Sequence, residues 1–418
     1  MSDESEVPPD VIVIGAGVVG LSVALALQGR GLSVRVLDRK GVAAEASRGN
    51  AGAFAFSDVL PLASPGILRK APKWLLDPDG PLSIPLGYLP AILPWLLRFW
   101  RASWRDRVAA STLAQASLNR HSMDSLDRLI RDIRGETLLR REGQLALYGS
   151  RQSYQAALPG WAYRRDFGIA FDHLEGADAI AAVQPGLSSA FRYATYTPDW
   201  LNVTDPFVYT THLAETFRAR GGRVETADVC GILPSETRAA IRTDSGMLSA
   251  EHVVLCAGAW SHRLARSLGD RIPLETERGY NTTLPAGAFD LRTHLTFGDH
   301  GFVVSRIGDG VRVGGAAELG GLSRPPRMQR AAAMLARAKR FLPDLVTDGG
   351  VQWMGFRPSL PDSLPVIGCA PASSRVFYAF GHGHLGLTQS AGTAELIADL
   401  VTGRAPAINL HPFRPTRF

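Results

Sequence analysis

The chain opens with apolar runs and glycines that predict a strand, a helix and a second strand. Residues 11–14 (VIVI) are a β-branched apolar run of the kind found in buried strands. Residues 18–28 are rich in Ala, Val and Leu and are followed by Gly29 and Gly31, which favour a helix end. Residues 32–37 form the next strand-like run. Two strands joined through a helix are expected to be parallel, with a right-handed crossover.

Helical periodicity returns in the middle of the chain. Asp205 followed by Pro206 favours a helix N-terminus, and Gly221 with Gly222 marks the other end of that helix. Before it, apolar side chains recur at helical spacing and predict a long helix with one buried face, through Met123, Leu126, Leu129, Ile130 and Ile133.

Two types of strand pattern follow. Residues 223–229 are strand-like, and residues 252–260 (HVVLCAGAW) form a continuous apolar run that predicts a buried parallel strand ending at Ala257 and Gly258. Ligands of parallel sheets bind at that end of a strand. Residues 271–320 instead alternate in short segments separated by turns, which indicates an antiparallel sheet. We therefore expect a nucleotide-binding sheet interrupted by a second, antiparallel sheet.

Residues 86–105 are apolar with interspersed prolines and arginines. This segment is too short and too broken by proline to cross a bilayer, which needs roughly 20 apolar residues. One interpretation is a helix that lies on a membrane surface, and the other is a helix that covers the substrate pocket. The residues that suit a membrane interface are Trp95, Arg98, Trp100, Arg101, Trp104 and Arg105.

Composition and charge narrow the function classes. The 418 residues are 45% hydrophobic and carry a formal net charge of +6, but the basic residues are spread along the chain, so nucleic-acid binding is not expected. Cys230, Cys256 and Cys369 are far apart in sequence and predict neither a disulfide framework nor a metal site. The acidic start has no secretory pattern, and a cytoplasmic location is expected.

The glycines after the first strand predict a dinucleotide site. Gly15 permits the tight turn, Gly17 lets the backbone approach a pyrophosphate, and Gly20 lets the helix pack on the strand. Asp38 ends the second strand, where its carboxylate would accept both ribose hydroxyls and repel a 2′-phosphate, so NADP is not expected. The pattern does not distinguish FAD from NAD. The candidate contacts are Gly15, Gly17, Val18, Val19, Gly20, Asp38 and Arg39.

Motifs beyond Asp38 carry a resemblance over nearly the whole chain. They are residues 47–52 (SRGNAG), Lys73 with Trp74, residues 278–280 (RGY), residues 311–315 (VRVGG), residues 355–368 (GFRPSLPDSLPVIG) and residues 381–386 (GHGHLG). The chain resembles the FAD-dependent amino-acid oxidoreductases typified by glycine oxidase and D-amino-acid oxidase, and most closely the bacterial D-amino-acid dehydrogenases.

The resemblance implies a fold and a division into domains. The expected class is α/β (α+β, two domains), with a Rossmann-like FAD-binding domain and a discontinuous antiparallel-sheet substrate domain. The FAD-binding domain is expected at residues 1–60, 140–160, 198–270 and 350–418. The substrate domain is expected at residues 61–139, 161–197 and 271–349.

The resemblance also implies FAD as cofactor and a set of contacts to it. Residues 47–52 would run beside the pyrophosphate and flavin, although a plain Gly/Asn turn is an alternative. Residues 381–388 precede a helix whose amides would stabilise negative charge on the flavin, although two solvated histidines in a turn are an alternative. The further contacts implied are Ser47, Asn50, Ala51, Gly52, Val229, Ala257, Gly258, Trp260, Gly381, His382, Gly383, His384, Leu385, Gly386, Leu387 and Thr388.

Three residues are expected at the substrate. Arg357 resembles the family arginine that binds the substrate carboxylate through its guanidinium fork, with a structural pair to Asp362 as the alternative. Tyr280 would add a hydroxyl to that carboxylate, or be an ordinary core tyrosine. His384 stands where glycine oxidase has a second arginine, and is the candidate base.

The expected reaction is hydride transfer from the Cα of a small amino acid to flavin N5, which leaves an imine for hydrolysis and needs no metal. The leading substrates are D-proline and cis-4-hydroxy-D-proline, because residues 381–387 and 412–418 are similar to enzymes that oxidise them. Alternatives are an oxidase of the glycine or sarcosine type that uses oxygen, an NAD-dependent dehydrogenase, and a flavin-binding scaffold without turnover. A quinone acceptor and peripheral contact with the inner membrane face are further expectations.

Overall fold

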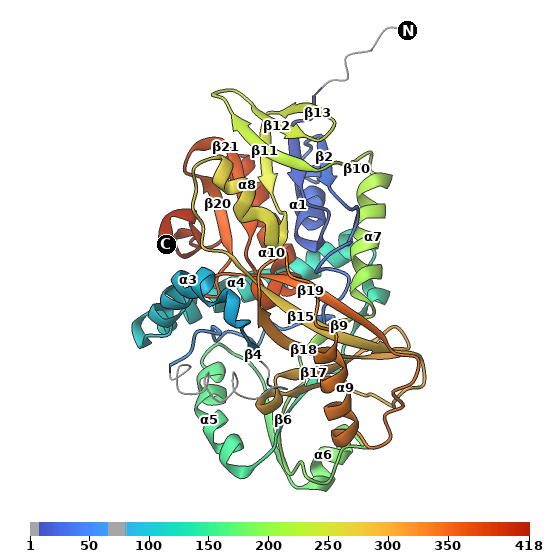
Figure 1. Cartoon of the computed structure of the whole chain (residues 1–418). Helices are drawn as coiled ribbons and strands as arrows, with labels where there is room; N and C mark the ends of the chain where they lie inside the picture. The colour runs from blue at the N-terminus through green and yellow to red at the C-terminus, as the bar shows by residue number, and fades with distance from the viewer. Residues whose placement is uncertain (1–7, 66–79, 81) are drawn as a thin grey trace.

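The computed structural model describes residues 8–65, 80 and 82–418, so Lys73 and Trp74 lie outside the described residues. Two large sheets organise the described chain, one in the upper and one in the lower part of Figure 1. The blue N-terminal and red C-terminal segments come together in the upper part (Figure 1).

The upper sheet has six strands in the order β10-β2-β1-β14-β21-β20. Its pairs are parallel except β20 with β21, which are antiparallel. This confirms the predicted parallel unit at the start of the chain and the parallel strand before Ala257. The strands are β1 (Val11–Ile14), β2 (Val34–Asp38), β10 (Arg223–Thr226), β14 (His252–Leu255), β20 (Val366–Ala370) and β21 (Ser373–Phe380).

Burial on both faces explains why β1 is apolar throughout. Val11 and Val13 belong to one hydrophobic core, whereas Ile12 and Ile14 belong to another on the opposite face. Alternate residues of a strand point to opposite faces of the sheet, so a strand covered on both sides needs an apolar residue at every position.

Helices cover one face of this sheet. They are α1 (Val18–Gln28), α7 (Pro206–Ala219) and α10 (Gly386–Val401), with α4 (Arg105–Asp132) packed on α10. The contact of α4 with α10 is close at Gly392, where a Cβ atom would overlap with Ser122. The predicted N-cap is confirmed, because the Asp205 carboxylate accepts hydrogen bonds from the amides of Phe207 and Val208 at 2.7 and 3.3 Å.

Smaller elements complete the upper part. An antiparallel meander packs on the other face of the sheet together with α8 (Ser261–Ser267), and contributes Ile232 and Ile241 to the core there. A second three-stranded sheet links the loop after residue 50 to later parts of the chain. The meander strands are β11 (Val229–Pro234), β12 (Ala239–Thr243) and β13 (Gly246–Ala250), and the linking strands are β3 (Ala53–Phe54), β5 (Leu139–Arg140) and β9 (Leu201–Val203).

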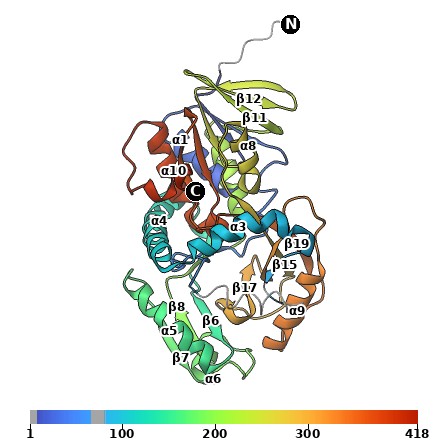
Figure 2. The same cartoon turned by 60° about the vertical axis from the view of Figure 1, so that its left-hand side comes forward.

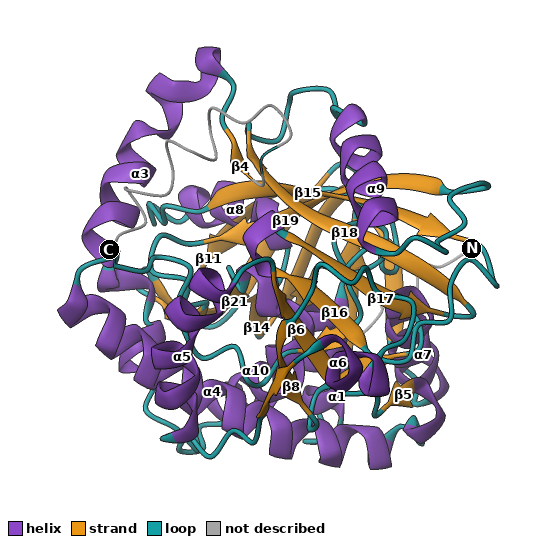
Figure 3. Cartoon of the chain, turned by 90° about the horizontal axis from the view of Figure 1, so that it is seen from below, coloured by secondary structure: helices purple, strands orange, loops and turns teal. Residues whose placement is uncertain are grey.

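The lower sheet crosses the centre of Figure 3, with helices around its rim. Its nine strands are mostly antiparallel, as the alternating pattern of residues 271–320 predicts. Helices α5 (Arg151–Arg165), α6 (Ala177–Val183) and α9 (Gln329–Phe341) flank it. The strands are β19 (Val351–Ser359), β15 (Glu275–Leu284), β18 (Gly310–Leu319), β17 (Phe302–Ile307), β16 (His294–Phe297), β6 (Gln144–Tyr148), β8 (Tyr193–Thr197), β7 (Asp172–Glu175) and β4 (Leu82–Ser83).

The division into domains differs from the prediction in three places. Strands β6 and β19 were expected in the FAD-binding part, but β6 pairs with β16 and β8, and β19 pairs with β15. Helix α4 was expected in the substrate part, but it packs on α10. These partners are distant in sequence, so local patterning carries no information about them.

Helix α3 (Leu89–Ala102) lies between the two halves of the molecule, as Figure 2 shows. A short 3-10 turn, Leu86–Tyr88, leads into it. Ile92 and Trp95 on its inner face are buried, and Leu93, Leu97 and Trp100 on its outer face are exposed. Within the described part of the chain, no helix is both long enough and apolar enough to span a membrane.

Candidate active site

A cavity of about 1310 Å³ lies between the carboxyl ends of the upper strands and one face of the lower sheet. Its lining comes from parts of the chain that are distant in sequence, namely residues 14–64, 82–99, 227–264, 277–319 and 353–387, together with Gln144 and Trp200. The volume exceeds the usual 300 to 1,000 Å³ of a small-ligand pocket and suits a dinucleotide together with a second, smaller molecule.

The first glycine loop is fixed by close backbone packing. Gly15 has φ of +115°, and a Cβ atom there would overlap with the carbonyl oxygen of Cys256 at the end of β14. A Cβ atom on Gly20 would overlap with the carbonyl of Gly15. Both glycines therefore keep the N-terminus of α1 pressed against the sheet, with Gly17, Val18 and Val19 lining the cavity.

Asp38 holds this loop as well as lining the cavity. Its Oδ2 accepts a hydrogen bond from the Ala16 amide at 2.9 Å, and its Oδ1 accepts from the amides of Lys40 and Gly41 at 2.8 and 3.0 Å. The carboxylate is thus fixed at the end of β2, where the prediction of ribose contacts requires it.

Residues 47–52 form a turn that faces the cavity. The Asn50 side chain makes the turn, because its Oδ1 accepts from the Gly52 amide at 2.7 Å and its Nδ2 donates to the Ser47 carbonyl at 3.1 Å. The lower sheet fixes the loop from the other side, since Arg312 donates to the Asn50 carbonyl at 2.6 Å and Asn281 donates to the Gly49 carbonyl at 2.7 Å. From the sequence, a plain Gly/Asn turn was the alternative to a loop beside the cofactor. In the structure, residues 47–52 form such a turn and also lie at the cavity.

The C-terminal glycine segment presents a helix N-terminus to the cavity. Gly381 and Gly383 adopt φ of +86° and +53°, and α10 begins at Gly386 with no side-chain cap on its first amides. Residues 381–387 line the cavity. Uncapped amides and the positive end of the helix dipole can receive a carbonyl or an anionic group here.

The two histidines of this segment differ in environment. His382 is buried and its Nε2 lies 3.0 Å from the Thr393 hydroxyl; burial lowers the pKa of His382 to about 3, so its ring is neutral. The alternative of two solvated histidines is therefore wrong. The side chain of His384 is 40% exposed, and its Nε2 lies 2.7 Å from Oε2 of Glu277.

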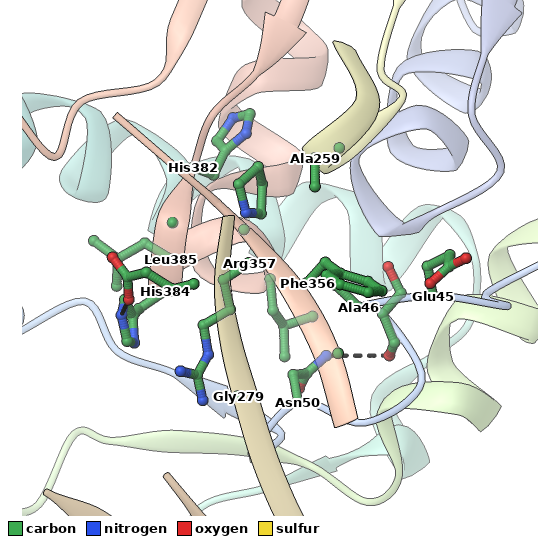
Figure 4. A pocket seen from close by; sticks show the side chains of 18 of the residues that line it. Glu45, Ala46, Asn50, Ala259, Gly279, Phe356, Arg357, His382, His384 and Leu385 are labelled. Carbon is green, nitrogen blue, oxygen red and sulfur yellow. Dashed lines mark hydrogen bonds and ion pairs between the residues drawn. The ribbon is translucent and has the colours of Figure 1, made fainter. Parts of the chain in front are cut away.

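Arg357 extends from β19 to the surface of the cavity. It is partly buried and donates to the Ala316 carbonyl at 2.9 Å, and a Cβ atom on Gly279 would overlap with its guanidinium group. Burial lowers the pKa of Arg357, and Glu277 acts in the opposite direction. The alternative pair with Asp362 is wrong, since Asp362 bonds to Arg417 at 2.8 Å. In Figure 4, Arg357 lies between His384 and the loop of Ala46 and Asn50.

Tyr280 does not offer a free hydroxyl. The ring is buried in the core of the lower sheet, and the hydroxyl donates to Glu318 at 2.6 Å while it accepts from the Arg327 amide at 3.1 Å. The hydroxyl therefore both donates and accepts a hydrogen bond within the protein. We therefore leave Tyr280 out of the proposed substrate contacts, in favour of the core alternative.

Helix α3 closes one side of the cavity. Trp95, Leu96 and Phe99 line it, and the rings of Trp95 and Phe99 stack with centroids 5.1 Å apart. This supports the interpretation of the segment as a cover over the pocket, while its outer face remains exposed.

Known proteins resemble this chain along nearly its full length. The family model described as DAO, FAD dependent oxidoreductase, matches residues 10–400. A D-amino-acid oxidase of Bradyrhizobium diazoefficiens is 35% identical over 98% of each chain, and a D-amino acid dehydrogenase of Phenylobacterium zucineum is 34% identical over 96% of this chain and 95% of its own. The chain belongs to the DAO family of FAD-dependent oxidoreductases.

The fold of this DAO-family protein matches solved relatives. The crystal structure of glycine oxidase from Geobacillus kaustophilus has a TM-score of 0.77 at 22% identity, with 98% of this chain and 99% of the other covered. The α/β architecture and FAD as the cofactor are thereby established. The residues present fit this cofactor, because two glycine segments, each at the N-terminus of a helix, meet at one cavity.

Most predicted cofactor residues of the DAO-family protein line the cavity. In the cavity lining, the Arg39 guanidinium stacks 3.7 Å from the centre of the Trp260 ring. Gly20, Gly52 and Thr388 do not line the cavity. Gly20 packs against Gly15, and Gly52 adopts a φ of +72° at the end of the turn. Thr388 accepts a hydrogen bond from the Ala55 amide at 2.9 Å. The specific contacts of each residue with FAD stay predictions.

Sequence reasoning missed several carboxylates in the cavity lining, among them Glu277 and Asp58. Glu277 precedes the RGY motif and pairs in register with Arg357 across β15 and β19. Burial by itself raises the pKa of Glu277, but His384, Arg357 and Ser359 lower it to about 2, so the group is ionised. Asp58 lies in the cavity wall near Arg164, and burial raises the pKa of its carboxyl. Strand β15 (ETERGYNTTL) is largely polar, so an acidic residue within it gave no distinctive signal in the sequence.

Proposed function

We propose that this protein is an FAD-dependent D-amino-acid dehydrogenase or oxidase that takes a hydride from the Cα of a small amino acid. The observation that carries the proposal is Arg357, a partly buried cation that faces the cavity beside the second glycine segment. In the described part of the chain its guanidinium donates to a carbonyl and makes no carboxylate pair within 4.0 Å. A bound amino acid would supply a carboxylate in direct contact with this cation, in addition to Glu277, which lies on the paired strand without an ion pair to it.

The residues would divide the work between binding and charge stabilisation. Arg357 would hold the substrate carboxylate in a fixed orientation, which gives the positional advantage of a bound reactant. FAD, when bound, supplies the hydride acceptor. The N-terminal amides of α10 would stabilise negative charge on the acceptor side, and α3 would exclude water with Trp95 and Phe99.

D-proline and cis-4-hydroxy-D-proline remain the leading substrates. The support is the sequence of residues 381–387, which line the cavity. The closing stretch, residues 412–418, gives no such support, because Phe413 is buried in the core and Arg417 anchors Asp362 and the Leu364 carbonyl away from the cavity. A ring amine would give a cyclic imine as product.

An anaerobic panel of amino acids tests this function. The purified protein is expected to be yellow, and its flavin absorbance to be bleached within seconds by D-proline or cis-4-hydroxy-D-proline, with the L-enantiomers at least about tenfold slower, a difference of about 1.4 kcal/mol in the barrier. Faster bleaching by glycine or sarcosine would favour the oxidase alternative. A flavin that no D- or L-amino acid reduces would leave the scaffold alternative.

We further propose that the outer face of α3 lies on an anionic lipid surface, where a quinone would accept electrons. The side chains of Leu89, Leu93, Leu97, Trp100 and Trp104 recur at helical spacing and are 40 to 55% exposed. Arg98, Arg101, Arg105 and Arg107 follow the same stretch of chain and would complement an anionic headgroup layer. The inner face of the same helix lines the cavity, which would bring a membrane-soluble acceptor close to the flavin.

Co-sedimentation with vesicles that contain anionic lipid tests the surface. Leu93→Glu with Leu97→Glu is expected to lower the bound fraction at least about tenfold, because each buried leucine contributes about 1.5 to 3 kcal/mol. Leu233→Glu is the control, since Leu233 is 51% exposed on β11, away from α3. Equal sedimentation of both variants, or no binding of the unaltered protein at low salt, would contradict the proposal.

A further inference from the structure

Glu277 occupies a position for which substrate binding alone gives no reason. It places a carboxylate beside Arg357, across the β15–β19 pair, in the cavity where the substrate carboxylate would arrive. Two carboxylates next to one guanidinium repel each other. A third group must compensate for this charge, and His384 is the side chain in direct contact with Glu277, at 2.7 Å.

We propose that Glu277 positions His384 as the base that takes the proton from the ammonium group of the substrate. The inference rests on the proposed function and deepens it. Amino acids are bound from solution as ammonium ions, whereas loss of hydride from Cα needs a free electron pair on nitrogen to form the C=N bond. A proton acceptor is therefore required before the hydride leaves.

The geometry of the Glu277–His384 pair determines which ring nitrogen of His384 can accept the substrate proton. Nε2 of His384 faces the Glu277 carboxylate, so in the neutral ring Nε2 carries the proton and donates it to Oε2. Nδ1 is then the acceptor, and it has no hydrogen-bond partner within the described residues. The His384 side chain is 40% exposed and lines the cavity, so Nδ1 is accessible to a bound ligand.

The proton transfer balances without any further reactant. The ammonium N–H bond breaks, an N–H bond forms at Nδ1, and the electron pair stays on the substrate nitrogen. The positive charge moves to the imidazolium, which Glu277 stabilises. The resulting row of substrate carboxylate, Arg357, Glu277 and imidazolium alternates in charge, so the repulsion between the two carboxylates is offset.

Other charged groups around His384 come from each element packed against it. Arg357 lies on β19 and Asp58 follows β3, with Arg164 of α5 3.9 Å from Asp58. His382 precedes the same 3-10 turn and is neutral, because burial lowers its pKa to about 3. Burial raises the pKa of Asp58, so Glu277, whose pKa is about 2, is the better-ionised partner of the imidazolium.

Single-turnover flavin reduction at saturating D-amino acid, measured from pH 5.5 to 10, tests the pair. The limiting rate is expected to rise with pH, because only an unprotonated base can take the ammonium proton. Glu277→Gln is expected to lower the plateau at least about a hundredfold, because a carboxylate that orients a histidine and fixes its tautomer contributes this much or more. The ascending limb is expected to move to lower pH, since the imidazolium loses its counter-charge. Glu277→Asp, which keeps the charge, should restore most of the rate.

Binding of pyrrole-2-carboxylate, which has a carboxylate but no basic amine, separates this role from a structural one. Its dissociation constant is read from the shift of the flavin spectrum. With Glu277→Gln we expect tighter binding by about threefold or more, because one negative charge beside Arg357 is removed, about 0.7 kcal/mol at this ratio. Damage to the site would instead weaken binding and slow reduction together.

The matched control is Glu275→Gln on the same strand, where the Glu275 carboxylate accepts a hydrogen bond from Tyr88 at 2.9 Å. Glu275→Gln should change neither the pH range over which the rate of flavin reduction rises nor the affinity for pyrrole-2-carboxylate. If the unaltered protein is reduced but Glu277→Gln behaves like Glu275→Gln, this inference fails and the proposed function stands. If no amino acid reduces the unaltered protein, the proposed function itself fails. If Glu277→Gln does not retain FAD, the pH profile of flavin reduction by Glu277→Asp decides. A profile in which the rate does not rise with pH overturns the inference, and a profile in which the rate still rises with pH supports it.

Discussion

Replacement of Arg357 by alanine is expected to lower kcat/KM for an amino acid by about a thousandfold, mainly through KM. Truncation of one member of a buried charge pair costs about 4 kcal/mol, which corresponds to this factor. The effect should be large because Arg357 is partly buried in the cavity lining, where a bound carboxylate would meet its guanidinium directly. The measurement is steady-state kinetics with the best substrate of the panel.

The chain offers a matched control for Arg357. Arg306 lies on β17 of the same sheet and pairs with Glu142 at 3.3 Å, outside the cavity. Arg306→Ala should keep normal kinetics, and both variants should retain FAD and be bleached by dithionite. Full turnover of Arg357→Ala with amino acids would show that the carboxylate is held elsewhere.

Replacement of Gly15 by alanine is expected to abolish FAD binding at micromolar concentrations. The residue has φ of +115°, and the added Cβ atom would overlap with the backbone carbonyl of Cys256, which cannot move without disturbing β14. Strain of this kind costs more than about 3 kcal/mol, so the dissociation constant of FAD should rise at least about a hundredfold. Flavin content and fluorescence titration of the apoprotein measure the change.

Gly29→Ala is the control for Gly15→Ala. Gly29 caps the other end of α1 with φ of −64°, and the nearest neighbour of an added Cβ atom lies at 3.4 Å, an ordinary contact. This variant should bind FAD normally. If Gly15→Ala also binds FAD normally and keeps its thermal stability, the glycine loop is not packed against β14 as described.

The cofactor end was predictable because its chemistry lies in the backbone. Gly15 and Gly381 adopt positive φ angles and leave no room for a Cβ atom, and such glycine positions are visible in the sequence. The continuous apolar run of β1 likewise indicated a strand buried on both faces. Local patterning therefore established the upper sheet and its helix.

The substrate end was less predictable because its contacts join distant segments. Glu277 meets His384 only because β15 brings the carboxylate next to a turn that lies 107 positions later in the chain. Tyr280 was expected in the site because its neighbours resemble a motif, yet its hydroxyl turns to Glu318. Strand β6 was misplaced for the same reason, since its partners β8 and β16 are remote in sequence.

The segment at residues 86–105 shows a different limit. Its two interpretations were posed as alternatives, but they concern opposite faces of α3. Trp95 and Phe99 cover the cavity, whereas Leu93 and Leu97 face outward. A pattern along the chain shows that a helix has two apolar sides, and only the packed structure shows which side is covered.

A crystal structure of the FAD complex with pyrrole-2-carboxylate would test the account most directly. The account predicts the flavin between residues 47–51 and residues 381–387, with the analogue carboxylate on the Arg357 guanidinium and its ring nitrogen on the side of His384. A carboxylate bound instead at Arg164, with Arg357 still donating only to the Ala316 carbonyl, would contradict it.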